Sequence, residues 1–236
     1  MRVVEDADRV TLNELMKPVP FVRQHYQTTL RRPYSRKLMR PVALYRDRMH
    51  ALWAHLESDP DIAGYNESVM ALPMVVDGKA VNISPAAMSL DGDGNPTVHS
   101  FAESEPAIAD AAALAYCSPP WEDWARRRGF RHVAWTPETL LGARVRLSNL
   151  LRLLRFVCIA GAVPDFQLEQ RLLATLADAR KMTFAVLARN FPTSDVELVH
   201  ASIARLILDR KVFSDIDHHP FSMITELSVH EHAWQR

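Results

Sequence analysis

The spacing of hydrophobic residues predicts a helix early in the chain and a change to strands after residue 60. From residue 41 to residue 57 the apolar side chains recur at helical spacing, and Pro41 suits a first helical turn. The polar run Ser58-Asp59-Pro60-Asp61 predicts the end of this helix. The apolar positions are Val42, Leu44, Tyr45, Met49, Leu52, Trp53 and Leu56.

The next segment has the short apolar runs and turn residues that are typical of strands. Strands are expected at 65–74, 80–84, 87–90 and 97–101. The turns between them fall at Asp77-Gly78-Lys79 and at Asp91-Gly92-Asp93-Gly94-Asn95, where glycine permits tight reversals. These runs predict a strand meander.

Helices and one more strand follow the meander. We expect helices at 106–116 and 119–128, with Gly129 closing the second, and a strand at 131–135. Thr136 and Pro137 then open another helix, as an N-cap and a first-turn proline. Helix, meander, helix, strand and helix together predict an α/β fold with a mixed sheet.

The pattern changes again after Gly161. Helices are predicted at 165–178, 183–190 and 194–209, and two short strands at 212–216 and 221–229. Three helices followed by a β-hairpin are typical of a winged helix-turn-helix. We therefore divide the chain into an arm (1–40), an α/β domain (41–160) and a winged-helix domain (161–236).

Charge along the chain is uneven, although the net charge is zero. Residues 1–55 hold 11 Lys+Arg and 5 Asp+Glu, residues 56–123 hold one lysine and 12 acids, and residues 124–155 hold eight arginines and one acid. Basic segments with prolines and aromatics suit contact with a phosphate backbone, although they also suit a solvated face. The predicted DNA-binding residues are Arg23, Arg31, Arg32, Arg36, Lys37, Arg40, Arg126, Arg127 and Arg128.

The remaining composition narrows the class of protein. No apolar run is long enough to span a bilayer, and the N-terminus lacks the features of a signal peptide, so a cytoplasmic protein is expected. Cys117 and Cys158 form no metal or redox motif, and we expect them to be buried free thiols. With seven glycines and no phosphate-binding loop, no cofactor is expected.

Several phrases of the sequence resemble one family. The run LESDPDIAGYNESVMALPMVVDGKAVNISPAAMSLDGDG, residues 56–94, is similar to the N-terminal domain of TnsA-type proteins, the endonuclease subunit of heteromeric transposases. The phrases VAWTPETL (133–140), SNLLRLLRF (148–156) and SIARLILDRKVFSDIDHHPFSMITEL (202–227) resemble later parts of the same family, in the same order. The resemblance implies a restriction-endonuclease-like domain followed by a winged helix.

The resemblance also implies where a nuclease would hold its metal. The family places one carboxylate after a proline, another acid or amide on the next strand, and a lysine two residues later. Here those positions hold Ala86, His99 and Phe101. Mg²⁺ requires oxygen ligands, so the site is interpreted as degenerate, without catalytic residues or metal.

Other acids and histidines leave alternatives open. Asp47 or Glu57 could supply the acid that the family carries on its helix, and Asp91, Asp93 and Glu103 could form a relocated metal site. A cluster near the C-terminus could bind Zn²⁺ or Ni²⁺, but an exposed polar tail explains it more simply because no cysteine joins it. Its members are Asp215, Asp217, His218, His219, His230 and His232.

The helix predicted at 194–209 is a poor reader of DNA. Asp195 and Glu197 lie near its start, and Arg205 is its only full positive charge. We therefore expect a protein-docking module here. The hypothesis is a non-catalytic TnsA-like subunit that contacts DNA through its basic arm and docks on a transposase subunit and an AAA+ ATPase. The rivals are an active Mg²⁺-dependent endonuclease with relocated ligands and a winged-helix regulator.

Overall fold

The computed structural model describes residues 7–19, 29–76, 79–102, 118–142, 144–159 and 164–229. The chain divides into two compact units. The first comprises residues 1–33, 41–56 and 61–142, and the second comprises residues 34–40, 57–60 and 143–236. Residues 144–159 were predicted to belong to the α/β domain, whereas in the structure they group with the C-terminal helices.

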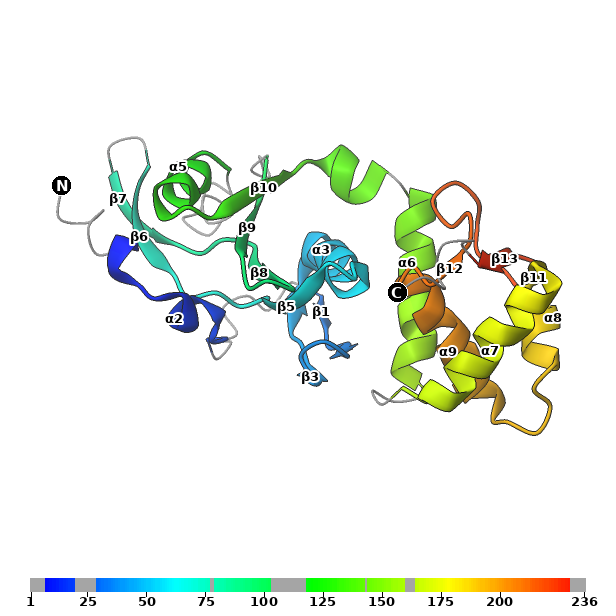
Figure 1. The fold of residues 1–236 in the computed structure, drawn as a ribbon. Helices are drawn as coiled ribbons and strands as arrows, with labels where there is room; N and C mark the ends of the chain where they lie inside the picture. The colour runs from blue at the N-terminus through cyan, green and yellow to red at the C-terminus, as the bar shows by residue number, and fades with distance from the viewer. Residues whose placement is uncertain are drawn as a thin grey trace. The chain divides into compact units, whose positions relative to one another are not determined.

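A four-stranded mixed sheet forms the centre of the first unit (Figure 1). Its strands are β5 (Ile62–Asn66), β8 (Ala87–Asp91), β9 (Pro96–Phe101) and β10 (Arg131–Trp135), in the spatial order β10-β9-β8-β5. The pairs β5–β8 and β8–β9 are antiparallel, and β9–β10 is parallel. The prediction of an α/β fold with a mixed sheet is confirmed.

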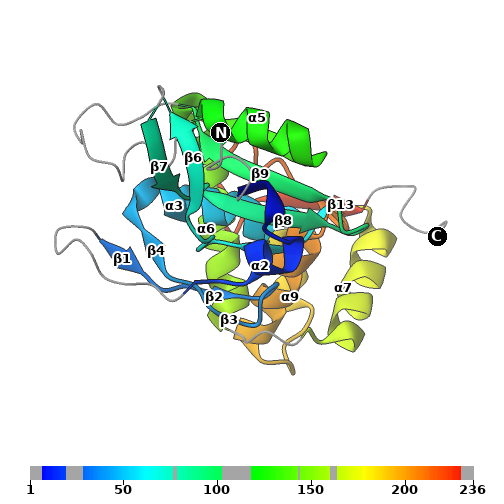
Figure 2. The same ribbon diagram turned by 90° about the vertical axis from the view of Figure 1, so that its left-hand side faces the viewer.

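Helices cover both faces of this sheet. Helix α3 (Arg46–Ser58) lies on one side of β8 and β9, and α2 (Leu12–Met16) and α5 (Ser118–Arg128) lie on the other (Figures 1 and 2). The second face carries the hydrophobic core, in which Trp121 and Trp124 of α5 are fully buried. Met88 and Val98 project into that core from β8 and β9. Consequently their alternate neighbours on the two strands face α3.

Local chemistry explains the β8–β9 hairpin and the end of α5. The Asp91 carboxylate accepts hydrogen bonds from the backbone N–H groups of Asp93 (3.0 Å) and Asn95 (2.8 Å), and Gly94 has a φ of 83°. Gly129 ends α5 with a φ of 68°, which costs glycine little. These boundaries were predicted correctly.

Other boundaries in the first unit were predicted wrongly. Pro41 does not open a helix: it lies in β3 (Arg40–Pro41), which pairs with β2 (Tyr34–Ser35), and α3 begins only at Arg46. The strand predicted at 65–74 is two strands, β5 and β6 (Leu72–Val76), and β6 pairs with β7 (Lys79–Ile83). The helix predicted at 106–116 lies outside the described residues.

Short elements complete the first unit. Strand β1 (Leu30–Arg31) pairs antiparallel with β4 (Leu44–Tyr45). After β10, the side-chain oxygen of Thr136 accepts the N–H of Thr139 at 3.1 Å, which confirms the predicted cap. The segment that it opens is a five-residue π-helix, Glu138–Gly142, rather than one long helix.

The second unit is mainly helical. It contains α6 (Arg144–Ile159), α7 (Phe166–Ala179), α8 (Phe184–Arg189) and α9 (Val196–Leu208). A small sheet has the order β11-β13-β12, formed by Lys181–Thr183, Glu226–Val229 and Val212–Phe213. Strand β11 was not predicted, and the strand predicted at 221–229 begins only at Glu226.

Helix α9 is the central helix of this unit. It packs against α6, and also against α7 and α8 (Figure 1). Every residue from Ala201 to Leu208 is buried. Asn149 of α6 holds the loop of residues 216–221 in place. Its amide donates hydrogen bonds to the carbonyls of Ile216 (2.7 Å) and His219 (2.8 Å) and accepts the N–H of Phe221 (2.7 Å). In the part of the chain that the structure describes, no helix could cross a membrane.

Candidate functional site

The structure brings together the three positions that the TnsA resemblance assigned to metal ligands and a lysine. Ala86 donates its backbone N–H to the carbonyl of His99 at 2.9 Å, and Ala87 is the register partner of His99 across β8 and β9. Phe101 lies two residues along β9, on the same face as His99. We call Ala86, His99 and Phe101 the hairpin site.

His99 in the hairpin site is held as a neutral imidazole. Trp135 donates its indole N–H to Nδ1 at 3.2 Å, so the ring proton lies on Nε2, which donates to the Ser89 hydroxyl oxygen at 2.8 Å. Burial is the main reason that the pKa of His99 is lowered to about 3, and the nearby His132 contributes to the same shift. Both ring nitrogens are engaged, and His99 therefore has no lone pair to offer a metal ion.

Aromatic and apolar groups fill the rest of the hairpin site. Trp135 stacks on His55 of α3, with ring centroids 5.1 Å apart, and lies 6.2 Å from the His99 ring. The guanidinium of Arg48 lies over the Phe101 ring at 5.9 Å. Ala86 and Phe101 are 1% and 4% exposed. The hairpin site is therefore a packed part of the fold.

The carboxylates considered as relocated ligands have other roles. Asp91 holds its own turn and lies 3.7 Å from Arg131, and hydrogen bonds from Asn95 are the main reason that its pKa is lowered. Asp93 is exposed in the same turn, and Glu103 lies outside the described residues. Asp47 is exposed and pairs with Arg31 at 2.8 Å. None of these contacts points to a metal site.

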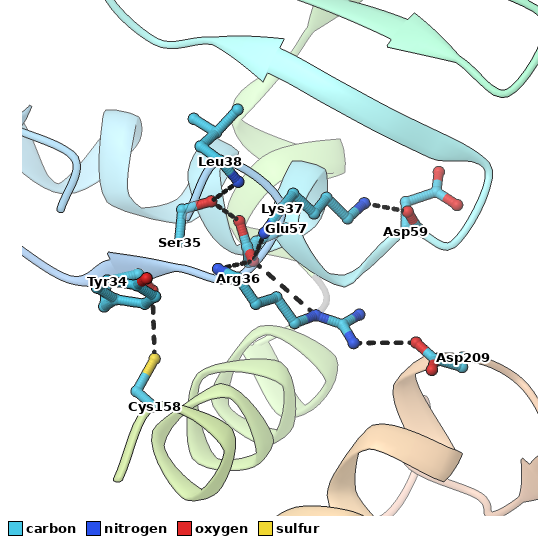
Figure 3. Close-up of polar contacts among 9 residues, drawn as sticks. All are labelled: Tyr34, Ser35, Arg36, Lys37, Leu38, Glu57, Asp59, Cys158 and Asp209. Carbon is cyan, nitrogen blue, oxygen red and sulfur yellow. Dashed lines mark hydrogen bonds and ion pairs between the residues drawn. The ribbon is translucent and has the colours of Figure 1, made fainter. Parts of the chain in front are cut away.

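Glu57, the other acid considered, organises a loop of the second unit (Figure 3). Its Oε1 accepts the N–H groups of Arg36 (2.9 Å) and Lys37 (3.3 Å), and its Oε2 accepts the Ser35 hydroxyl (2.7 Å). The Ser35 oxygen in turn accepts the N–H of Leu38 at 3.1 Å. With 1% exposure, Glu57 serves as the internal anchor of residues 35–38.

The anchored loop presents two cations toward α9. Arg36 pairs with Asp209 at 3.0 Å and is 3.9 Å from Glu57, while Lys37 donates to the carbonyl of Asp59 (Figure 3). Burial is the largest cause that lowers the pKa of Lys37, to about 8. Both cationic side chains are therefore partly shielded from solvent.

A cavity of about 580 Å³ opens beside these cations, entirely within the second unit. We call it the cation cavity. Four of its lining residues are basic, two are acidic, and the others are apolar. The lining comprises Arg36, Lys37, Arg205, Lys211, Glu169, Asp209, Met39, Pro60, Pro164 and Phe166.

Two buried charged residues form one wall of the cation cavity. Arg205 of α9 is 3% exposed, and burial lowers its pKa while Glu169 opposes that shift. Glu169 of α7 is also 3% exposed and lies 4.0 Å from the Lys211 ammonium, and burial raises its pKa. The Glu169 Oε1 atom makes no hydrogen bond to any described residue.

Sequence reasoning missed the cation cavity, although a signal was present. Glu169 lies among the buried Leu168, Leu172 and Leu176 of α7, and Arg205 interrupts the apolar run of α9. A charged residue on the apolar face of a helix indicates a buried partner or a site. Arg205, the only full positive charge of the helix predicted at 194–209, is buried in the structure.

The predicted DNA-binding residues are distributed over both units. Arg31 and Arg32 are exposed in the first unit, whereas Arg36, Lys37 and Arg40 belong to the second. Arg23 lies outside the described residues.

The arginines of α5 differ among themselves. Arg126 is 76% exposed and pairs with Asp123, and Arg127 is 45% exposed and lies 3.4 Å from Asp8. Arg128 donates to the carbonyls of Asp8 and Val10, and lies 5.6 Å from the Trp124 ring. Arg128 therefore holds the backbone of residues 8–10 against α5. Arg126 is the most exposed of the three arginines and the most accessible to a phosphate.

Two further predictions concern histidine and cysteine. His219 pairs with Asp215 at 2.7 Å, and Asp217 pairs with Arg146 at 3.4 Å; within the described ranges no cluster of His, Cys, Asp and Glu could hold a metal ion. His230 and His232 lie outside those ranges, as does Cys117. Cys158 is exposed, so its predicted burial was wrong.

Comparison with known proteins identifies no family: no protein-family model matches the chain, and no curated protein matches it.

Proposed function

We propose that the chain is a non-catalytic, TnsA-like subunit of a DNA transposition complex. The observation that carries the proposal is the β8–β9 hairpin, in which the Ala86 N–H donates to the carbonyl of His99 and Phe101 lies two residues further along β9. These are the positions that the resemblance assigns to metal ligands and a lysine. This geometry, with neutral and closely packed side chains at the three positions, supports an evolutionary origin in a nuclease that has lost its metal ligands.

The element order of the first unit supports a restriction-endonuclease-like fold. Helix α3 precedes β5, the β8–β9 hairpin follows, and α5 leads into β10, parallel to β9. This is the helix, meander, helix and strand order that the sequence predicted. A sheet covered by helices on both faces suits such a domain.

The second unit supports a winged helix that docks on protein rather than reading DNA. Helices α7, α8 and α9 are followed by the antiparallel pair β12–β13, as in a wing. A recognition helix needs a free face with basic or amide side chains, yet α9 is buried from Ala201 to Leu208 and begins with the exposed Asp195 and Glu197. A transposase subunit or an AAA+ ATPase is the proposed partner.

Affinity purification from the native host tests the proposed function. The full chain, tagged and crosslinked in cells, should recover a transposase and a P-loop ATPase, identified by mass spectrometry. A matched control carries Asn149→Asp, which should release the 216–221 loop of the second unit because a carboxylate cannot donate to the two carbonyls. Recovery of neither partner class, or a repressor-like occupancy of promoters by the chain alone, would contradict the proposal.

A further inference from the structure

The cation cavity has the volume of a small-molecule site and is open toward solvent. Its volume of about 580 Å³ falls inside the range of roughly 300–1,000 Å³ that is usual for ligand pockets. Its walls come from α7, α9, the turn after α9 and the loop that Glu57 anchors. A loop fixed by a buried carboxylate gives the cavity a preformed wall.

The charges of the cavity favour an anion. Arg36, Lys37, Arg205 and Lys211 face two acids, Glu169 and Asp209, in the lining. Glu57 contacts Arg36 from the inner side of the loop. When Glu57 is counted with the lining residues, four basic and three acidic side chains leave a net charge of +1. Partly desolvated cations gain more from a bound anion than cations in open water do.

Glu169 adds one oxygen atom that no hydrogen bond within the described residues uses. Its Oε1 is buried without a hydrogen bond to any described residue, and burial raises the pKa of its carboxyl. A carboxyl that takes up a proton becomes an O–H donor, which an oxyanion can accept. Leaving such an oxygen unsatisfied costs free energy that a ligand would recover.

The shape of the cationic group selects phosphate over carboxylate. Arginine presents a planar fork that binds phosphate oxygens in pairs, and lysine adds a point charge. A phosphate monoester carries close to two charges and three terminal oxygens, whereas a peptide carboxylate carries one charge and two oxygens. Two guanidinium and two ammonium groups match the phosphate better.

An exposed aromatic ring lies at the same cavity. Phe166, the first residue of α7, is 68% exposed, and Met39 is 57% exposed. A large exposed ring beside cations is the arrangement in which a nucleic-acid base stacks while its phosphate is neutralised. Inorganic phosphate alone would leave this ring in water.

We propose that the cation cavity binds a nucleotide, with the phosphate among Arg36, Lys37, Arg205 and Lys211 and the base on Phe166. The ligand is either a free nucleoside monophosphate or the phosphorylated terminus of a DNA strand. If the ligand is the strand terminus, the site belongs to the proposed function, and the inference then rests on that function. If the ligand is a free nucleotide, the inference is independent of the proposed function.

Fluorescence anisotropy on the full chain tests the nucleotide site. The probes are short, 3′-labelled single strands with a 5′-phosphate or a 5′-hydroxyl, and the competitors are dAMP and inorganic phosphate. We expect the 5′-phosphate strand or dAMP to bind, with the 5′-phosphate strengthening strand binding about tenfold or more, since charge-assisted hydrogen bonds are worth roughly 1.5–3 kcal/mol. Displacement by dAMP assigns a free nucleotide, and resistance to dAMP assigns the strand terminus.

Matched variants locate the binding. Lys211→Gln and Phe166→Ala alter exposed parts of the lining, so they should fold normally and weaken binding about tenfold. Arg189→Gln and Phe213→Ala change an exposed cation and an exposed ring of the same unit outside the lining, and they should bind like the parent. Phe166→Ala should weaken dAMP more than inorganic phosphate.

Three results would overturn the nucleotide site. One is equal binding of the phosphorylated and hydroxyl strands together with no binding of dAMP. Another is equal loss in the lining variants and their controls. A third is that the cavity binds an acidic peptide, that Lys211→Gln abolishes this binding, and that phosphate is not preferred. This result would assign the cavity to a protein partner. Duplex DNA binding that persists in the lining variants would leave the proposed function standing while the cavity proposal fails.

Discussion

The hairpin site and the cation cavity both contain buried ionisable side chains, but they use them in opposite ways. At the hairpin site His99 gives one ring nitrogen to Trp135 and the other to Ser89, and stacked rings cover it. At the cavity, Arg205 and Glu169 are as deeply buried, yet they border open volume. Burial of a polar group indicates function only when its hydrogen-bonding capacity is not consumed by the fold.

Charge placed in the hairpin site should produce the largest effect. His99→Glu puts a carboxylate in a buried position where no described cation pairs with the side chain. We therefore expect this substitution to lower the free energy of unfolding by roughly 3–5 kcal/mol. Glu169→Gln removes charge from the cavity and should cost about 1–2 kcal/mol, because the amide keeps the shape and the cavity admits water. Urea denaturation measures both, and equal costs would contradict the contrast between a closed and an open site.

Two pairs of basic residues should differ in duplex DNA binding. Arg31→Gln with Arg32→Gln removes exposed charge and should lower the slope of log K against log salt by up to about two units, since each phosphate contact contributes about 0.9. Arg36→Gln with Lys37→Gln should lower it less, because these cations pair within the cavity wall. The measurement is anisotropy at several salt concentrations, with Arg189→Gln as control.

Equal flattening by the two pairs would instead show that residues 31–37 contact DNA as one surface. An unchanged slope in both would remove this segment from the DNA interface.

A further prediction concerns the pH dependence of stability. The folded pKa of His99 is about 3, below the unfolded value of about 6.5, so the unfolded chain binds the extra proton as pH falls between these values. The contribution of His99 is therefore present above about pH 6.5 and is lost at about 1.4 kcal/mol per pH unit toward pH 3.

His99→Gln should remove this slope, since glutamine does not titrate. Unfolding free energies at pH 7, 6 and 5 compare the two proteins, and His218→Gln is the control because His218 is exposed. A parent and variant with the same slope would contradict the neutral, fully bonded imidazole.

Periodicity and turn chemistry allowed much of the first unit to be predicted from sequence. The Asp91–Asn95 turn, the Gly129 stop and the Thr136 cap each depend on neighbours in sequence, so local rules found them. The start of α3 was missed because Pro41 satisfies two rules equally, as a first helical residue and as an edge-strand residue. The pairing of β3 with β2 decided the outcome, and the apolar spacing of residues 41–57 alone does not reveal it.

The candidate sites divide in the same way. The β8–β9 hairpin could be predicted because its two strands are joined by a short turn. The cavity could not, because Arg36, Glu169 and Arg205 come from segments far apart in the chain and meet only through packing. The sequence marked Glu169 and Arg205 only as charges among apolar neighbours.

A plasmid-cleavage assay tests the central claim most directly, namely that the hairpin site is a nuclease scaffold without metal chemistry. Supercoiled DNA is incubated with the full chain and either Mg²⁺ or Mn²⁺ at a protein concentration that retards the plasmid in a gel. The account predicts binding with no nicked or linear product, because His99 offers no lone pair and Ala86 and Phe101 offer no ligand. Nicking that disappears on Asp91→Ala or Glu103→Ala would contradict it and establish a relocated metal site.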